Sequence, residues 1–402
     1  MRWLPLLACV PLMGCATASG PVARGQLAIA PPGPASASLD RGVALFREVG
    51  RKSAGNLLLS PVSLSGALAP AMEAARGPTR SGMEQALGLP AEDAMTKAGA
   101  LQKALTAGRE GATVTIANAL WLAPEFRPDP AFVARAKTLL GSEVSTLEFE
   151  RDPEGAARRI NDWAAANTAG KIRNVISPPF LGTRLVITNA VYMLADWAEP
   201  FRASDSRDEP FYTASGAVSA RLMRRAGGYR MVEAEGAQWI DLPYRDGRLS
   251  MTVVLPKERN GLSALERSLT PVRAAQHLRL LDSAEPREVE LFLPQVEFSS
   301  RSLLNEPLKA LGMGEAFSER ADFTGFGHGE PLRISKVLQN GFLRVDEKGT
   351  EAAAITTVEI VVTGARASSL PVFRADHPFL YLIRDRQTGA LLFIGRVANP
   401  RG

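Results

Sequence analysis

Apolar positions along this chain follow a helical spacing in its first half and form β-like runs in its second half. Helices are predicted over 38–50, 61–76, 79–87, 129–140 and 154–168. Strands are predicted over 114–122, 184–193, 239–242, 249–255, 289–298, 332–345, 379–383 and 391–397. Because helices come early and strands late, the pattern favours an α+β fold over a regularly alternating α/β fold.

The stretch from 345 to 365, VDEKGTEAAAITTVEIVVTGA, combines loop and strand features. Gly349 follows a charged cluster and indicates a hinge. Alternate positions from there are small or apolar: Thr350, Ala352, Ala354, Thr356, Val358, Ile360 and Val362. Glu351 and Glu359 lie between them, which gives the period-2 pattern of a strand with one buried face. We therefore predict a loop that can be inserted into a sheet as a strand.

Several sequence blocks, in order along the chain, resemble those of the serpin family of serine protease inhibitors. GTEAAA after VDEKG resembles the hinge of the family's reactive-centre loop, and FRADHPFLYLIRDRQTGALLFIGRVANP resembles its C-terminal signature. The blocks NLLLSPVSLSGALAPAMEAARGPTRSGMEQALG, INDWAAANTAGKI, ITNAVYMLADWAEPF, RDEPFY, DLPYRDGRLSMTVVLPKE and VELFLPQVEF are similar as well. Each block alone is a weak match, but the ordered set, from about residue 38 onward, is specific.

The resemblance implies a serpin fold with three β-sheets, eight to nine helices and an exposed reactive-centre loop at about 346–371. A five-stranded central sheet would accept the loop as a sixth strand. The implied activity is irreversible suicide inhibition of serine proteases, with cysteine proteases as a second class. The target protease would supply the chemistry and become attached as an acyl-enzyme. The resemblance thus implies a monomer with no enzymatic activity of its own, no cofactor and no metal.

The resemblance also assigns the residues of the loop. Its hinge would comprise Glu347, Gly349, Thr350, Glu351, Ala352, Ala353 and Ala354. The family's spacing places the scissile bond at Thr363–Gly364, and Arg366–Ala367 is the rival. Moving the bond to Arg366 would add three residues, about 10 Å of extended chain, and such slack would weaken the pull on the protease. No proline lies between 346 and 370, which favours insertion.

The resemblance also assigns polar residues that would control opening of the sheet. Ser60 and Ser63 match the family's shutter serines, and Asn189 matches its shutter asparagine. Gln339 stands where the family commonly has histidine; it can donate and accept hydrogen bonds but brings no pH sensitivity. Trp197 matches the tryptophan at which the loop first enters the sheet. Ordinary core packing is the alternative for these five residues.

The charge of the chain changes this picture little. The formal net charge is +5, and acidic residues are interleaved with basic ones. The densest basic patch is RLMRRAGGYR, in which Gly227 and Gly228 suggest a hairpin turn. A solvated hairpin is favoured there over a polyanion site. No motif supports binding of nucleic acid.

The N-terminal residues predict export. An apolar core at 3–13 follows Arg2, and Leu12-Met13-Gly14-Cys15 resembles a bacterial lipobox, in which Cys15 would be lipidated. The alternative is an ordinary secretory peptide that is cut near Ala16. The predicted organisation is a signal peptide (1–14), a lipidated and flexible Pro/Gly/Ala/Ser tether (15–37) and a serpin domain (38–402). The protein would be anchored to the cell envelope, at the periplasmic or surface face of the outer membrane, or otherwise secreted.

Catalytic motifs are absent from the sequence. There is no G-x-S-x-G, H-E-x-x-H or C-x-x-C, and the only cysteines are Cys9 and Cys15. A Ser/His/Asp triad assembled in space stays open on spacing alone, but His377, before Pro378, is predicted to be a structural hydrogen-bonding group. Besides the inhibitor, two functions remain: a binding or chaperone-like serpin whose loop never inserts, and an exported hydrolase, which the missing nucleophile motifs disfavour.

Overall fold

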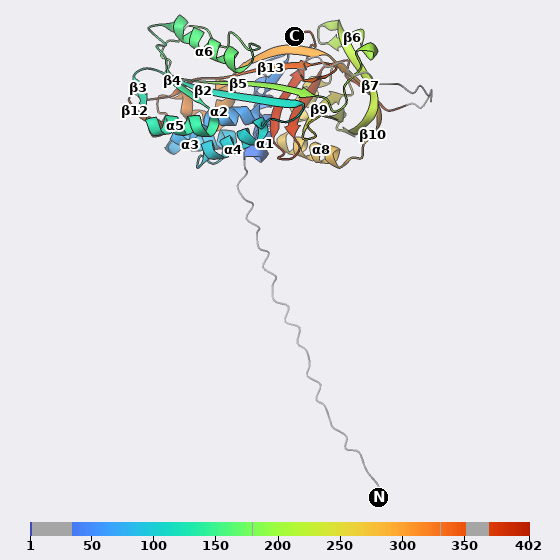
Figure 1. Cartoon of the computed structure of the whole chain (residues 1–402), viewed down its shortest axis with the longest axis horizontal. Coiled ribbons are helices and arrows are strands. Elements are labelled where there is room, and N and C mark those ends of the chain that lie inside the picture. The colour runs from blue at the N-terminus through green and yellow to red at the C-terminus, as the bar shows by residue number, and fades with distance from the viewer. Residues whose placement is uncertain (2–33, 179, 330, 351–369) are drawn as a thin grey trace. The chain divides into compact units, whose positions relative to one another are not determined.

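A six-stranded sheet separates α6 on one of its faces from α2 on the other (Figure 1). The computed structural model describes residues 1, 34–178, 180–329, 331–350 and 370–402, and Pro32–Gly402 form one compact unit. In spatial order the strands of this sheet are β11 (Val296–Leu303), β13 (Ile334–Val345), β14 (Gly349–Thr350), β5 (Leu185–Asp196), β2 (Ala112–Leu122) and β4 (Glu143–Thr146). The central pair, β13 and β5, is parallel and directly hydrogen-bonded from Ile334 to Gly341. Beyond Gly341 the two-residue strand β14 lies between them.

A second, nine-stranded sheet is built around the 19-residue strand β7 (Gly216–Ala234). One part of β7 pairs with β6 (Arg207–Thr213) and β10 (Arg287–Pro294), and the rest pairs with β8 (Ala237–Pro243). The remaining strands are β1 (Leu57–Leu59), β9 (Leu249–Pro256), β15 (Val372–Arg374), β16 (Phe379–Asp385) and β17 (Leu391–Val397). This long strand thus joins two of the three predicted sheets. A short ribbon of β3 (Phe126–Pro128) and β12 (Gly327–Gly329) completes the strands of the described residues.

Nine α-helices occur in the part of the chain that the structure describes, within the predicted eight to nine. They are α1 (Pro34–Gly50), α2 (Pro61–Ala74), α3 (Gly77–Leu87), α4 (Ala94–Thr106), α5 (Pro130–Leu140), α6 (Pro153–Asn167), α7 (Leu262–Ser268), α8 (Pro271–Ser283) and α9 (Asn305–Leu308). Three of them begin alike, with proline after a capping side chain: Asp129 before α5, Asp152 before α6 and Thr270 before α8. Proline suits the first helical position because its missing N–H would have no partner there.

Alternation along β13 assigns its side chains to two different environments. Leu338 and Phe342 face α6 and the segment after it, together with Trp121 and Trp163. Gln339, one position from Leu338, instead faces the start of α2. The sheet is therefore buried on both faces.

Three predictions about elements were wrong in detail, and one helix was missed. The first helix begins at Pro34 rather than at Ser38, whose hydroxyl lies inside the helix, donating to Ala35 O (2.5 Å) and accepting from Leu391 N (2.8 Å). The predicted strand 289–298 is two strands, β10 and β11, that belong to different sheets and are separated only by Gln295. Helix α4 was not predicted.

The predicted hairpin in the basic patch is also wrong, because Gly227 and Gly228 lie within the continuous strand β7. Three of its four arginines lie near carboxylates. Arg224 pairs with Glu290 and Arg225 with Glu199, and Arg221 lies 3.8 Å from Asp208. This charge neutralisation argues against a polyanion site on the strand.

None of the helices within the described residues has the length and apolar character that a membrane span requires.

Candidate functional site

Four predicted site residues meet beneath the six-stranded sheet, where they form one buried hydrogen-bond network. Asn189 on β5 donates from Nδ2 to Ser63 Oγ (2.5 Å) and to Asn118 Oδ1 (2.8 Å). Gln339 on β13 donates from Nε2 to Asn189 Oδ1 (2.8 Å) and to Ser60 O (2.9 Å), and its Oε1 accepts from Ser60 N (2.8 Å). Because all five residues are buried, these bonds link β13, β5, β2 and α2 without competition from water.

The start of the predicted hinge is already paired with the sheet. Thr350 on β14 lies opposite Val345 of β13 and opposite Ala195 of β5, and β14 is antiparallel to both strands. The Thr350 side chain is 1% exposed, and its Oγ1 lies 2.7 Å from the hydroxyl of Tyr244. Position 349 requires glycine, since a Cβ there would lie 2.0 Å from Ala195 O. The first residue pair of a sixth strand is therefore in place.

Trp197 holds the turn that precedes β14. Its Nε1 donates to Asp346 O (3.0 Å), and its backbone N donates to Lys348 O (2.7 Å). The indole is buried and stacks on Tyr244, with ring centroids 4.7 Å apart and an interplanar angle of 5°. Burial raises the pKa of Tyr244 far above its usual value, although the hydrogen bond with Thr350 opposes this shift, so the hydroxyl stays neutral. That the loop first enters the sheet at Trp197 stays a prediction.

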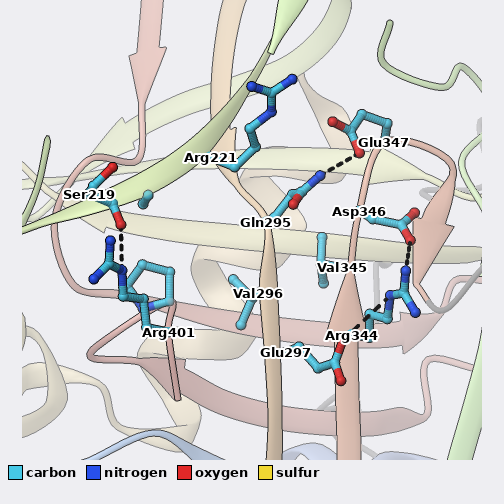
Figure 2. Close-up of a pocket in the computed structure, with 12 residues that line it drawn as sticks. Ser219, Arg221, Gln295, Val296, Glu297, Arg344, Val345, Asp346, Glu347 and Arg401 are labelled. Carbon is cyan, nitrogen blue, oxygen red and sulfur yellow. Dashed lines mark hydrogen bonds and ion pairs between the residues drawn. The ribbon is translucent and has the colours of Figure 1, made fainter. Parts of the chain in front are cut away.

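Glu347 ties the same turn to two segments that are distant in the sequence. Its Oε2 accepts from Gln295 Nε2 (2.6 Å), and its Oε1 accepts from Ser206 Oγ (2.8 Å) (Figure 2). Its carbonyl oxygen accepts from Phe201 N (2.8 Å). Both side-chain donors are neutral, so the carboxylate is held by hydrogen bonds alone.

Sequence reasoning missed Asn118, Ser206, Tyr244 and Gln295. Asn118 interrupts the apolar run VTIANALWL, and the Pro294-Gln295 pair interrupts the run at 289–298, so each left a signal. Ser206 and Tyr244 left none, because only the folded chain brings them to the hinge.

Several predicted residues lie outside the described part of the chain. They are Glu351, Ala352, Ala353 and Ala354 of the hinge, both candidate reactive bonds (Thr363–Gly364 and Arg366–Ala367) and the lipidation residue Cys15. Their roles stay predictions.

His377 and His277 offer no support for the hydrolase alternative. His377 Nδ1 lies 2.8 Å from Asp376 Oδ1, but its Nε2 lies 2.7 Å from the carbonyl oxygen of Pro256, so neither ring nitrogen can activate a serine. His277 packs edge-on against Trp239 at 5.0 Å between ring centroids. Among the described residues, no group of three or more His, Cys, Asp or Glu side chains is placed to hold a metal ion.

A sheet with a strand entering between β5 and β13, above a buried polar network, defines a class of protein that matches a known family. The family model for serpins (serine protease inhibitors) matches residues 36–400, and the chain therefore belongs to the serpin family. Its fold is the serpin fold. Members of this family are protease inhibitors rather than enzymes.

Individual relatives agree with this assignment. An uncharacterized serpin-like protein of Thermococcus kodakarensis is 36% identical over 361 residues, which cover 89% of this chain and 83% of the relative. The leukocyte elastase inhibitor of Sus scrofa is 31% identical over 89% of this chain and 96% of its own length. The crystal structure of human thyroxine-binding globulin complexed with thyroxine has a TM-score of 0.83 and 26% identity, covering 92% of this chain and 99% of that one.

Proposed function

We propose that this serpin is an irreversible inhibitor of serine proteases, with cysteine proteases as a second target class, and that it acts by inserting its cleaved loop into the six-stranded sheet. The observation that carries the proposal is the pairing of Thr350 with both β13 and β5. Because β14 lies between β13 and β5, it can lengthen only if these two strands, which pair directly from Ile334 to Gly341, separate from each other.

The reaction begins with the protease. Its catalytic serine attacks the carbonyl carbon of the scissile residue, an ester bond forms, and the peptide bond breaks to release a new amino terminus. The loop then remains joined to the protein only at the hinge, so it can enter the sheet with the protease attached. Each ladder hydrogen bond gained contributes about 0.5–1.5 kcal/mol, and burial of Val358, Ile360 and Val362 contributes about 1.5 kcal/mol or more for each side chain.

The register of β14 predicts the neighbours of the inserted strand. Antiparallel pairing that continues from Thr350 opposite Val345 and Ala195 would bring Ala354 opposite Gly341 and Val191. In the present structure Gly341 and Val191 are themselves paired. The same continuation would place Val358 against Val337, in the buried core. The small and apolar positions of the loop would thus lie on the face of the sheet opposite α6.

The proposal is tested by thermal unfolding before and after a single protease nick within 355–366. Insertion converts a less stable native state into a more stable one, so we expect the nick to raise the melting temperature (Tm) strongly. Ala354→Pro should abolish this rise, because proline has no N–H to donate to the sheet. The matched control is Ser369→Pro, which lies beyond both candidate bonds and should leave the rise intact. A wild-type chain whose Tm stays the same or falls after the nick contradicts the inhibitory mechanism.

The reactive bond is proposed at Thr363–Gly364, with Arg366–Ala367 as the rival. Mass spectrometry of the fragment released from a protease complex identifies the bond. A fragment that begins at Gly364 supports the proposal, whereas one that begins at Ala367 assigns the bond to Arg366 and points to trypsin-like targets.

The alternative is a serpin that binds a ligand or a client without insertion. Human thyroxine-binding globulin, whose solved structure contains thyroxine, shares this fold. A nick that leaves the Tm unchanged would favour such a role.

We further propose that the protein is a monomeric bacterial lipoprotein, exported and anchored through Cys15. Metabolic labelling with a radioactive fatty acid should mark the wild-type protein but not a Cys15→Ala variant. Labelling that survives the substitution would exclude the lipobox.

A further inference from the structure

His377, which is 6% exposed, lies between two hydrogen-bond acceptors. Its Nδ1 is 2.8 Å from Asp376 Oδ1, and its Nε2 is 2.7 Å from the carbonyl oxygen of Pro256. Both are hydrogen-bond distances. A backbone carbonyl oxygen and an ionised carboxylate can accept a hydrogen bond but cannot donate one, so both ring nitrogens must donate. The geometry therefore requires a ring with two N–H groups, which is the positively charged imidazolium form of histidine.

Asp376 is ionised in the folded chain, so it does not supply the second proton. Its Oδ2 accepts from Arg374 Nε (3.2 Å), while its Oδ1 faces His377. Burial by itself would raise the pKa of Asp376, but the hydrogen bonds from His377 and Arg374 overcome this effect, and the pKa lies below its usual value. The proton between Asp376 and His377 therefore resides on the ring.

A neutral imidazole would not fit this position. It carries one N–H group and one lone pair, and in either tautomer that lone pair would face an oxygen of Asp376 or of Pro256. The ring is buried, so solvent does not relieve such a contact, and a buried polar atom without a partner is costly. Loss of one proton would thus break one of the two bonds.

The elements around the ring leave the charge of Asp376 to act on it. Arg374 binds Glu209 of β6 in addition to Asp376. Further charged groups of the segment after Pro256 are exposed to solvent: Lys257, which pairs with Glu233, Glu258, and Arg259, which lies over the ring of Tyr212. Solvent and salt screen such exposed charges, so the charge of Asp376 dominates at His377.

The two bonds of His377 hold the segment at which the predicted reactive-centre loop ends. β15 pairs in parallel with β10, at one end of the nine-stranded sheet, and Asp376 follows it two residues later. His377 joins this segment to Pro256, the last residue of β9. A ring with one proton would keep it on Nδ1, where the carboxylate is the stronger acceptor, and the link to Pro256 would be lost.

We propose that His377 is an imidazolium in the native protein and that this charged ring is a positioning residue, which holds β15 until it loses a proton at alkaline pH. The protonation state is independent of the proposed inhibition, whereas its effect on the reactive-centre loop rests on that proposal. A group that binds its proton more tightly in the folded than in the unfolded chain stabilises the fold at low pH, and this stabilisation is lost as the pH rises through the titration of the folded group. The attachment of β15 should therefore weaken on the alkaline side of neutrality.

Nuclear magnetic resonance of the full chain, labelled with nitrogen-15 histidine, tests the protonation state directly. The chain has three histidines, so His377→Gln assigns the signals of His377 by difference. We expect both ring nitrogens of His377 to be protonated at pH 7 and Nε2 to lose its proton first as the pH is raised. Asp376→Asn, which keeps an acceptor oxygen but removes the charge, should move this loss to lower pH. A His377 ring that is neutral at pH 7 would overturn the proposal, whatever the protein does to proteases.

Amide hydrogen exchange of the peptide that contains Val372–Arg374 tests the effect on β15. Comparison of two chains at the same pH cancels the intrinsic pH dependence of exchange. We expect His377→Gln to exchange on the order of tenfold faster than the wild type at pH 7, because the single amide nitrogen of glutamine cannot reach both acceptors. This ratio should shrink as the pH rises and the wild-type ring loses its proton.

His328→Gln is the matched control, since His328 is exposed, and it should exchange like the wild type at every pH. A ratio between His377→Gln and the wild type that stays constant with pH would overturn the role of the ring proton.

Discussion

Among single residues, two asparagines of the six-stranded sheet differ in the hydrogen bonds that their side-chain amides form. Asn189 donates to Ser63 and Asn118 and accepts from Gln339. Asn340, on the opposite face of β13 from Gln339, is 2% exposed, and neither of its amide atoms has a hydrogen-bond partner among the described residues. A buried polar group without a partner lowers the stability of the state that contains it. Asn340 therefore lowers the stability of the native sheet.

We predict that Asn340→Leu raises the free energy of unfolding of the native chain by about 1–3 kcal/mol, because the change removes an unsatisfied amide of similar size. Asn189→Leu is the matched substitution on the adjacent strand, and it should lower the same free energy. Urea unfolding of the un-nicked chains measures both. Destabilisation by Asn340→Leu would show that its amide is satisfied in the native state.

Some residues of the candidate site could be predicted from the sequence, and others could not. Ser60, Ser63, Asn189 and Gln339 were assigned from sequence blocks, and the structure brings them into contact. Gln295 was not assigned, because its bond to Glu347 joins positions 52 residues apart and no local pattern encodes that distance. Polar residues within apolar runs can be recognised in a sequence, whereas their partners in distant loops cannot.

Among the elements, β13 carries a cation, Lys336, that packs against an aromatic ring. The ammonium group of Lys336 lies 4.9 Å from the ring centroid of Phe180, and no carboxylate of the described residues pairs with it. Burial lowers the pKa of Lys336. In the register that continues from Thr350 opposite Val345, Glu359 would lie directly opposite Lys336. Insertion would thus supply the missing carboxylate.

We predict a favourable coupling of about 0.2–1 kcal/mol between Lys336 and Glu359 in the nicked chain and none in the native chain. Guanidinium unfolding of Lys336→Gln, Glu359→Gln and the double variant, each nicked and un-nicked, measures this coupling. Strictly additive effects in the nicked chains would mean that the inserted strand takes another register or does not insert.

Some helices and strands were predicted correctly from the sequence, and others were missed. Long apolar runs such as β5 and β17 were found because burial on both faces leaves an uninterrupted pattern. The boundary between β10 and β11 was not found, because apolar residues resume at Val296 directly after the interruption at Pro294 and Gln295, while the chain changes sheets. Helix α4, which buries mainly alanine, glycine and methionine, has too weak an apolar stripe to stand out.

In the whole molecule, stability depends on buried carboxylates such as Asp385, the last residue of β16. Burial by itself would raise the pKa of Asp385, but hydrogen bonds from Arg248 and from the backbone of Gln387 overcome this effect, and the pKa lies below its usual value. Arg248 Nε lies 2.7 Å from Asp385 Oδ1. These interactions connect the start of β9 to the turn between β16 and β17.

The sign of the pH dependence follows from this lowered pKa. A carboxyl group whose pKa is lower in the folded than in the unfolded chain stabilises the fold above its unfolded pKa, about 3.9 for aspartate. The stabilisation is lost as the pH falls through the folded value. We therefore predict that Asp385→Asn lowers the Tm at pH 7 and that this difference shrinks below pH 4. A difference that is independent of pH would mean that Asp385 acts only through neutral hydrogen bonds.

The pairing of β1 with β17 has a consequence for biosynthesis. Leu57–Leu59 lie opposite Ile394–Arg396, and Tyr381 also donates its hydroxyl hydrogen to Leu57 O across 324 positions of sequence. While the ribosome is still translating the last strands, β1 and β9 have exposed edges that can pair with other chains. Closure of so long a loop is slow, so the nine-stranded sheet forms only after synthesis is nearly complete. The period of greatest risk for aggregation thus falls during translation, before the protein can meet any protease.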